Sequence, residues 1–436
     1  MADLSINFAG IKSPNPFWVA SGPPSNTAYQ CHRAFEAGWG GVVWKTIGDP
    51  IVNVSSRYSA LGAGGQRMVG FNNIELISDR SPETNFRELA ECKKAWPDRA
   101  IIASLMTDTR ENWHDYMKRS RDCGADGVEL NFGCPHGMCE RGMGSAVGQN
   151  PRVIETIVGW VMEVAEIPVI VKLTPNVTDI TEPARAAKKA GANAISLINT
   201  INSITQVNLD RMCPEPCVAG KSTHGGYCGP AVKPIALHMV HACAEDPEVG
   251  IPISGIGGIA TWKDAAEFIA LGAGSVQVCT AIMHFGFRIV EDMIDGMNLF
   301  MDEKGYRTMA EWTGKAVQSV EKWENLDLNY KCVADINYEK CIGCNLCYIA
   351  CEDGAHQAIE LVSPDDKGLG PGRMPGKPVP QVNVEHCVGC NLCAIVCPVD
   401  HCISMVDVKT GEMPMSWKQY QERMAKGEMK PIPAHP

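Results

Sequence analysis

The sequence contains no run of apolar residues long enough to cross a bilayer, although 45% of its 436 residues are hydrophobic. Positive charge is also scarce, because 39 Lys and Arg face 50 Asp and Glu and the formal net charge is -11. That balance argues against nucleic acid or an anionic membrane as the main partner. The first residues, Met1–Ser5, lack the basic region and apolar core of a signal peptide, so we expect a cytoplasmic protein.

Cysteine is abundant, but it lacks the regular spacing of a disulfide framework. Eight of the 20 cysteines fall into two dense runs near the C-terminus, and the other twelve are scattered. This usage is typical of a reducing compartment, where thiols are not oxidised to disulfides. Charged residues make up 20% of the chain, as in an ordinary soluble globular protein. The composition therefore indicates a soluble redox protein.

Two cysteine motifs near the C-terminus predict a pair of iron–sulfur clusters. Both have the spacing C-x2-C-x2-C-x3-C. In bacterial-type ferredoxins the first three cysteines of each run hold one [4Fe–4S] cluster and the fourth binds the other. By this rule one cluster binds Cys341, Cys344, Cys347 and Cys397, and the other binds Cys387, Cys390, Cys393 and Cys351. Two structural zinc sites are the alternative, since paired C-x2-C motifs also form all-thiolate tetrahedra.

Up to about residue 310, short apolar segments alternate with segments of helical periodicity. The expected strands are Phe17–Ser21, Gly41–Thr46, Ile101–Leu105, Val128–Phe132, Val169–Leu173, Ala194–Asn199, Ile253–Ile256 and Ser275–Thr280. The expected helices include Glu83–Trp96, Arg110–Cys123, Arg152–Ala165 and Trp262–Leu271. Several strands are rich in Val and Ile without alternation, as in parallel strands covered on both faces. This order predicts an α/β fold, a (β/α)8 TIM barrel, with an open doubly wound sheet as the alternative.

The chain is expected to divide into four regions. Residues 1–310 form the barrel, 311–334 a connector, 335–408 an α+β ferredoxin-like domain of the bacterial 2[4Fe–4S] type, and 409–436 a C-terminal tail. Within the ferredoxin-like domain, Ser363–Pro380 is rich in Gly and Pro and is expected to be a surface loop. In the tail, Trp417, Tyr420 and Met424 have the spacing of one helix face, to which we assign no function.

Polar residues follow most of the expected barrel strands, at the end where the active sites of such barrels lie. These residues are Ser21, Lys45, Thr46, Asn131, Lys172, Asn199, Thr200, Gly257, Gly258 and Thr280. Any one of them alone would more often be a helix cap or a core residue. Their recurrence at one rim predicts a site.

One segment of this rim, Gly255–Ala260, matches the dinucleotide fingerprint in form. The next strand, however, lacks the acidic residue that would hold a ribose. The loops after strands seven and eight are a common phosphate site in barrels. Backbone N–H groups of Gly257, Gly258, Thr280 and Ala281 could therefore bind a phosphate monoester.

Two lysines, Lys45 and Lys172, also lie at expected strand ends. Together with the phosphate site they indicate a flavin mononucleotide. A lysine beside the N1/O2 edge of the isoalloxazine stabilises the negative charge of the reduced ring. The combination predicts FMN, with two exposed surface lysines as the alternative. The expected cofactor-binding residues are Ser21, Lys45, Thr46, Lys172, Gly229, Gly257, Gly258, Thr280 and Ala281.

The segment 131–144, NFGCPHGMCERGMG, follows the fourth strand and has the glycine content of a lid. Here the sequence resembles the flavin domain of the dihydropyrimidine dehydrogenases, which are dihydroorotate dehydrogenase-like barrels. The resemblance extends to Asn73–Ser78, to Lys172–Ile180 and to both cysteine motifs. It covers roughly residues 4–300 and 335–408.

The resemblance implies a pyrimidine substrate, uracil or thymine, and names the residues that act on it. Cys134 matches the catalytic acid of the family. The pyrimidine-binding positions match Asn73, Asn131, Asn199 and Thr200. A carboxamide offers both a donor and an acceptor, as the edge of uracil requires. Flavin and pyrimidine C6 would exchange a hydride while the acid protonates C5 from the opposite face.

A cysteine can serve as this acid because an ordinary thiol, with a pKa of about 8.5, is mostly protonated at neutral pH. A buried structural thiol is the alternative for Cys134. Cys139 is a second thiol in the same segment and leaves the assignment open. His136 and Arg141 could contact substrate or order the lid.

The family also implies a partner. Its large single-chain members carry NAD- and FAD-binding domains before the barrel, and this sequence begins at the barrel. The expectation is therefore the FMN and iron–sulfur subunit of a bacterial enzyme, with NAD(H) and FAD on a separate subunit. The alternatives are a dihydroorotate dehydrogenase-like oxidoreductase, a tRNA-reducing flavoenzyme, which the acidic charge disfavours, and an electron-transfer subunit that turns over no pyrimidine.

Overall fold

The computed structural model describes residues 2–134, 142–370 and 374–431. The chain divides into two units, Met1–Ser319 and Val320–Pro436. In the part of the chain that is described, no helix combines the length and the apolar character needed to span a membrane.

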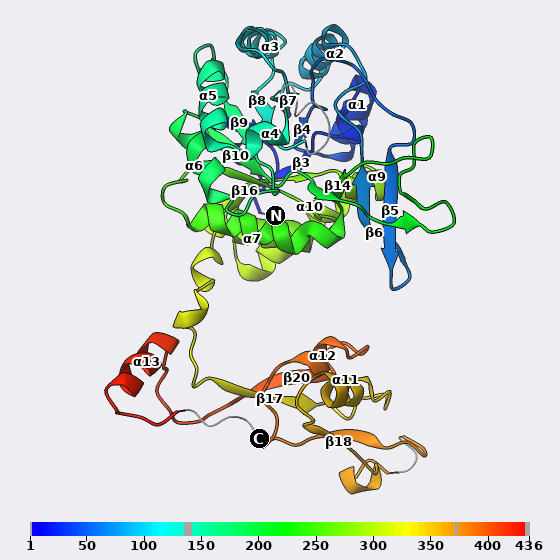
Figure 1. Cartoon of the computed structure of the whole chain (residues 1–436), viewed down its shortest axis with the longest axis vertical. Coiled ribbons are helices and arrows are strands. Elements are labelled where there is room, and N and C mark those ends of the chain that lie inside the picture. Colours follow the sequence, from blue (N-terminus) through cyan, green and yellow to red (C-terminus); the bar gives the residue numbers. More distant parts are fainter. Residues whose placement is uncertain (1, 135–141, 371–373, 432–436) are drawn as a thin grey trace. The chain divides into compact units, whose positions relative to one another are not determined.

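Eight parallel strands close into a barrel in the first unit (Figure 1). They are β3 (Phe17–Val19), β4 (Gly41–Val43), β7 (Ala100–Leu105), β8 (Gly127–Asn131), β9 (Val169–Lys172), β10 (Ala194–Leu197), β15 (Ile253–Ile256) and β16 (Ala273–Val278). Pairing of β16 with β3 and of β9 with β10 closes the ring. The predicted (β/α)8 barrel is confirmed, and the open sheet was the wrong alternative.

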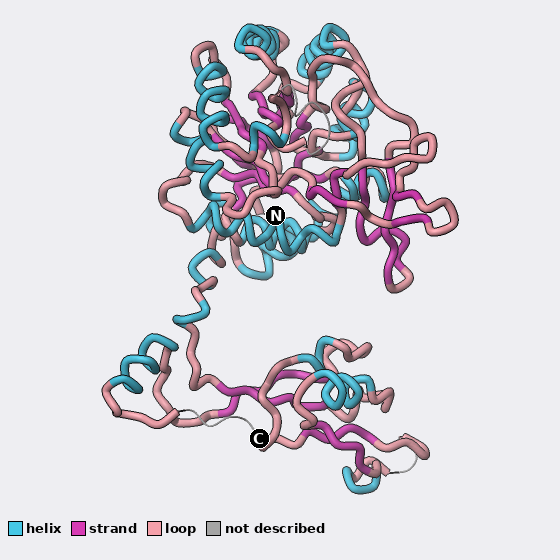
Figure 2. The backbone as a smooth tube through the Cα atoms, in the orientation of Figure 1, coloured by secondary structure: helices cyan, strands magenta, loops and turns pink. Residues whose placement is uncertain are grey.

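Helices surround this barrel (Figure 2). The longer ones are α1 (Ala28–Ala37), α2 (Pro82–Ala95), α3 (Arg110–Asp122), α5 (Pro151–Met162), α6 (Thr181–Lys189), α7 (Lys233–Glu245), α8 (Trp262–Ala270) and α10 (Ile289–Lys304). Hydroxyl caps fix several starts: Ser81 accepts the N–H of Thr84 at 3.2 Å, and Thr109 accepts the N–H of Asn112 at 3.2 Å. Such caps satisfy N–H groups that the helix itself leaves without partners.

The inside of the barrel is filled in layers. At the N-terminal end of the strands, an apolar cluster combines Phe8, Ile11, Trp18, Val43, Ala100, Ile102, Ile170 and Ala194. Two of these, Phe8 and Ile11, come from the hairpin β1 (Ile6–Phe8)–β2 (Ile11–Ser13), which the sequence did not predict. A second, polar layer consists of Glu129, Ser196, Ser254, Ser275 and Gln277, all at most 1% exposed. The barrel is therefore a packed core and not a pore.

A four-stranded antiparallel sheet, also missing from the sequence-based prediction, is added by long segments after β4 and β10. Its order is β11 (Ile201–Ser203), β14 (Gly225–Cys228), β6 (Gln66–Asn73) and β5 (Tyr58–Ala63). Asn73 pairs with Gly226 across β6 and β14. The sheet thus joins two segments that both leave the carboxyl end of the barrel.

The second unit is a small α+β structure with an internal repeat. Strand β17 (Lys331–Ile336) pairs with β20 (Ile403–Val408), and β18 (Ile359–Val362) pairs with β19 (Val379–Val382). The helices α11 (Leu346–Gly354) and α12 (Leu392–Ile395) each begin inside one cysteine motif. In the tail, α13 (Trp417–Ala425) stacks Trp417 on Tyr420 with ring centroids 5.2 Å apart.

Candidate active site and cluster sites

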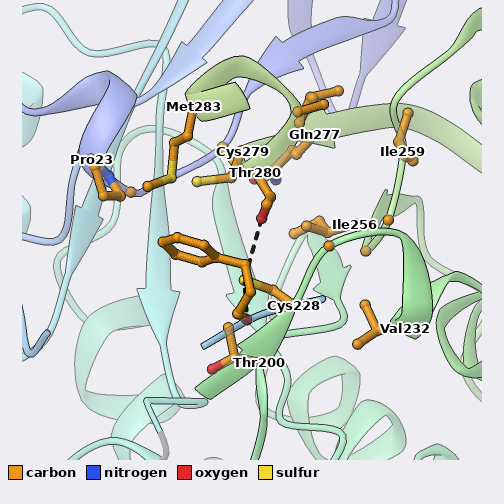
Figure 3. Close-up of a pocket in the computed structure, with 18 of the residues that line it drawn as sticks. Pro23, Thr200, Cys228, Val232, Ile256, Ile259, Gln277, Cys279, Thr280 and Met283 are labelled. Atoms are coloured by element: carbon orange, nitrogen blue, oxygen red, sulfur yellow. Dashed lines mark hydrogen bonds between the residues drawn. The ribbon is translucent and has the colours of Figure 1, made fainter. Parts of the chain in front are cut away.

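A cavity of about 1180 Å³ opens at the carboxyl ends of the barrel strands (Figure 3). Its lining includes Ser21, Lys45, Thr46, Asn73, Asn131, Cys134, Lys172, Asn199, Thr200, Gly229, Gly257, Gly258, Thr280 and Ala281. The fold therefore brings every barrel residue of the predicted site to one cavity, while the role of each stays a prediction. Pockets for single ligands are commonly about 300–1,000 Å³, so this one has room for a cofactor and a substrate.

A line of hydrogen bonds orients the amide side chains of the cavity. The Thr46 hydroxyl lies 3.2 Å from Ser21 Oγ and accepts from Asn131 Nδ2 at 3.0 Å. Asn131 Oδ1 accepts from Asn199 Nδ2 at 2.9 Å, and Asn199 Oδ1 accepts the N–H of Thr200 at 2.8 Å. Each amide is thereby held in one of its two flipped states, which fixes where a ligand finds a donor or an acceptor.

Both strand-end lysines are buried in the cavity wall. Lys45 is 4% exposed and Lys172 is 6% exposed. Lys45 Nζ lies 2.8 Å from Glu75 Oε1, which also binds Arg57 at 2.8 Å. Lys172 Nζ lies 3.5 Å from Glu129 Oε1. The two are therefore not exposed surface lysines, and each lies beside a carboxylate, as buried charges generally do.

The three loops of the predicted phosphate site approach one another closely. A Cβ on Gly258 would lie 2.9 Å from the backbone N of Lys233 and 3.0 Å from the carbonyl oxygen of Gly229. With φ at +76°, Gly258 also has a backbone conformation that other residues rarely adopt. Helix α9 (Thr280–Phe285) begins at Thr280, whose hydroxyl bonds the thiol of Cys228, the residue before Gly229. Closely packed glycine backbone and a helix start suit a phosphate group.

Asp264 holds the glycine-containing loop Gly257–Thr261 in place at the start of α8. Its carboxylate accepts from Ala260 N at 3.1 Å, from Thr261 N at 2.9 Å and from Lys233 Nζ at 2.6 Å. Burial alone would raise the pKa of Asp264, but the Lys233 ammonium and the N–H donors hold it below its usual value. The carboxylate therefore stays charged and keeps this loop fixed at neutral pH.

Cys134 is 5% exposed and packs in a small cluster with Ile77, Met106 and Met143. Its carbonyl oxygen accepts the N–H of Ser145 at 2.9 Å. Residues 135–141 of the lid, which include His136, Cys139 and Arg141, lie outside the described residues. The structure thus places one of the two candidate thiols at the cavity.

Sequence reasoning missed two further thiols in this cavity, Cys228 and Cys279 (Figure 3). Burial raises the pKa of Cys228 to about 11 and that of Cys279 to about 12, so both are protonated at neutral pH. Thr280 Oγ1 donates to Cys228 Sγ at 3.2 Å. Cys279 directly precedes Thr280 at the end of β16, so the strand-end pattern could have identified it.

In the second unit, each predicted quartet of cysteines surrounds its own small cavity. One cavity is lined by Cys341, Cys344, Cys347 and Cys397, and the other by Cys351, Cys387, Cys390 and Cys393. The crossed fourth cysteine is therefore visible in the geometry of both. Sequence reasoning missed Cys402, which also lines the first cavity. Burial raises the pKa of Cys347 and of Cys393 to about 11, so both are thiols at neutral pH unless a bound metal displaces the proton.

Comparison with known proteins gives the same two-part division. Residues 3–301 match the dihydroorotate dehydrogenase family model, and residues 334–405 match the 4Fe-4S dicluster domain. The chain is 44% identical over 360 residues to the NAD-dependent dihydropyrimidine dehydrogenase subunit PreA of Escherichia coli strain K12, covering 82% of this chain and 87% of that protein. It is 43% identical over 329 residues to the chloroplastic dihydropyrimidine dehydrogenase (NADP(+)) of Arabidopsis thaliana, covering 72% and 77%. It is 36% identical over 323 residues to the catalytic subunit of dihydroorotate dehydrogenase B (NAD(+)) of Pyrococcus abyssi, covering 72% and 99%.

Proposed function

Because the chain belongs to the dihydroorotate dehydrogenase family and carries a 4Fe-4S dicluster domain, we propose that it reversibly reduces uracil or thymine to the 5,6-dihydropyrimidine. The observation that carries the proposal is the single cavity that combines three asparagines, two buried lysines and a thiol. The 44% identity to a bacterial dihydropyrimidine dehydrogenase subunit supports the same substrate class.

The residues present fit FMN, and each has a defined task. The loops at Gly229, Gly257–Gly258 and Thr280–Ala281 would hold the phosphate through backbone N–H groups. Lys45 and Lys172 would face the polar edge of the ring. When bound, FMN supplies the hydride for C6 of the pyrimidine.

The pyrimidine would lie against the amides. Asn73, Asn131, Asn199 and Thr200 offer donors and acceptors for its alternating C=O and N–H groups. Cys134 would donate a proton to C5 from the face opposite to the hydride, as a general acid. Its burial beside Ile77 and Met143 shields the thiol from bulk solvent, which favours proton transfer to the substrate carbon over exchange with water.

Dihydroorotate is the rival substrate, since a relative named for it is 36% identical. Orotate carries a carboxylate, whereas Lys45 and Lys172 already lie within 3.5 Å of buried carboxylates. We expect the chemically reduced protein, kept anaerobic, to reduce uracil or thymine about 100-fold or more faster than orotate, because burying an uncompensated charge is costly. Product formation from each substrate measures this. Faster turnover of orotate would contradict the proposal and favour dihydroorotate dehydrogenase activity.

Electrons would enter through the two [4Fe–4S] clusters from a separate subunit that binds NAD(H) and FAD. The cysteine quartets support the clusters, and the name of the Escherichia coli relative, a subunit of an NAD-dependent enzyme, supports the partner. The clusters would then link the FAD of the partner to the FMN of the barrel.

The chain alone is accordingly expected to oxidise NADH poorly. Its dinucleotide-like segment, Gly255–Ala260, contributes Gly257 and Gly258 to the proposed FMN phosphate site and cannot serve a second nucleotide. An artificial reductant should drive uracil reduction while NADH alone gives near-background turnover, measured spectrophotometrically without oxygen. Rapid NADH-dependent reduction by the isolated chain would reveal a nicotinamide site that this assignment lacks.

A further inference from the structure

Glu129 is a charged side chain buried inside the barrel, beneath the cavity. It lies on β8 and is 0% exposed. Its Oε2 accepts from Ser196 Oγ at 2.8 Å and from Gln277 Nε2 at 3.0 Å. Gln277 itself lines the cavity (Figure 3). Two neutral donors therefore fix the carboxylate in one orientation without neutralising its charge.

The other oxygen of this carboxylate is directed at Lys172. Among the described residues, Glu129 Oε1 makes no hydrogen bond, and the nearest cation to it is Lys172 Nζ at 3.5 Å. Within the same part of the chain, the Lys172 ammonium makes no side-chain hydrogen bond, and Glu129 is its sole ion-pair partner. The ammonium is held by charge, and its three N–H donors can turn toward a ligand in the cavity.

The second lysine of the cavity is paired differently. Lys45 Nζ lies 2.8 Å from Glu75 Oε1, and Arg57 lies 2.8 Å from the same oxygen. Two cations share the carboxylate of Glu75, and their charges together offset its negative charge. Glu129 has no such second cation among the described residues, and Lys172 alone balances its charge.

We propose that Glu129 is a positioning residue that sets, through Lys172, how strongly the barrel stabilises the reduced flavin. The inference rests on the proposed binding of FMN. The lysine charge favours the added electrons, and the carboxylate 3.5 Å away limits how far the ammonium can turn toward the flavin. The pair, and not the lysine alone, then determines the reduction potential of the bound cofactor.

The test is the midpoint potential of FMN in full-length variants. Glu129→Gln keeps the shape and removes the charge, so the ratio of reduced to oxidised FMN at a fixed potential should rise about tenfold, equivalent to about 30 mV for a two-electron couple. Lys172→Met should move the potential the opposite way. In a Lys172→Met background, Glu129→Gln should have much less effect, as a double-mutant cycle would record.

Ser275→Ala is the matched control, because it removes a neutral member of the same buried layer and should leave the potential unchanged. Should Glu129→Gln fail to fold, Glu129→Asp keeps the charge but draws it away from Lys172, and the potential should rise by a smaller amount. An unchanged potential in a variant that retains FMN would overturn the inference, and so would an equal shift with and without Lys172. Absence of FMN from the wild-type protein would instead overturn the proposed function.

Discussion

Replacing Cys134 with Ala should slow pyrimidine reduction by about 10²–10⁴-fold, the usual contribution of general acid catalysis. The change removes the proton donor but leaves the phosphate loops, both lysines and the cysteine quartets in place. FMN content and the reduction of FMN by dithionite should therefore stay near wild type. Ser should restore little activity, since a hydroxyl is a far weaker acid than a thiol. Single-turnover reduction of uracil by the dithionite-reduced variants measures the effect.

Three other thiols provide the controls for this assignment. Cys139→Ala alters the same lid and should lose much less activity. Cys228 and Cys279 also line the cavity, but they lie beside Thr280 at the phosphate loops. Their replacement should weaken FMN retention more than the proton transfer step. If Cys139→Ala loses pyrimidine reduction while Cys134→Ala reduces uracil at the wild-type rate, the acid has been assigned to the wrong thiol.

Loss of the second cluster is the expected result of Cys351→Ala, even though Cys351 belongs to the first cysteine motif. Its thiol lines the cavity formed by Cys387, Cys390 and Cys393, and removing one ligand of four breaks the site. The wild-type protein should contain about eight iron atoms per chain, as two [4Fe–4S] clusters require. Electron paramagnetic resonance of the reduced protein should show that Cys351→Ala and Cys390→Ala lose the same signal.

Cys344→Ala should remove the other electron paramagnetic resonance signal, that of the cluster at Cys341, Cys347 and Cys397. Cys402→Ala is the control, because Cys402 lines the first cavity but lies outside both motifs, and it should retain both clusters. Turnover driven by NADH through the partner subunit should be abolished in Cys351→Ala, whereas turnover driven by dithionite should persist. A Cys351→Ala protein that loses the signal lost in Cys344→Ala would contradict the crossed arrangement.

The sequence predicted the barrel well because its strands are apolar runs with no competing pattern. Segments such as Val169–Lys172 and Ile253–Ile256 are buried on both faces, and their mostly apolar residues without polar alternation predict this burial. Six of the eight strands ended one to three residues earlier than predicted, as at β4, where the backbone beyond Val43 leaves the ladder within two residues. The N–H of Lys45, for example, donates to Ser25 O at 2.9 Å and not to a neighbouring strand.

The four-stranded sheet could not be found in the same way. Its strand β14 reads Gly-Gly-Tyr-Cys and β5 contains Gly and Ala, which have low strand propensity. These strands exist because distant segments pair, as Asn73 does with Gly226. Glu75 and Glu129 were missed for a related reason. In a sequence, a carboxylate among apolar residues is predicted to face solvent. Only the three-dimensional structure shows that a lysine lies beside it.

The crossing of the cysteine quartets has a consequence for how the protein is made. In the crossed arrangement that we propose, neither motif completes a cluster by itself, because Cys397 of the second motif lines one cavity and Cys351 of the first lines the other. During synthesis, the first motif leaves the ribosome with three ligands for one cluster and one for the other. The strand pair β17 and β20 likewise joins the segment just before the first motif to the segment just after the second. We therefore expect cluster insertion to wait until both motifs have been made, and a chain truncated before Cys387 to hold no complete cluster site of either kind.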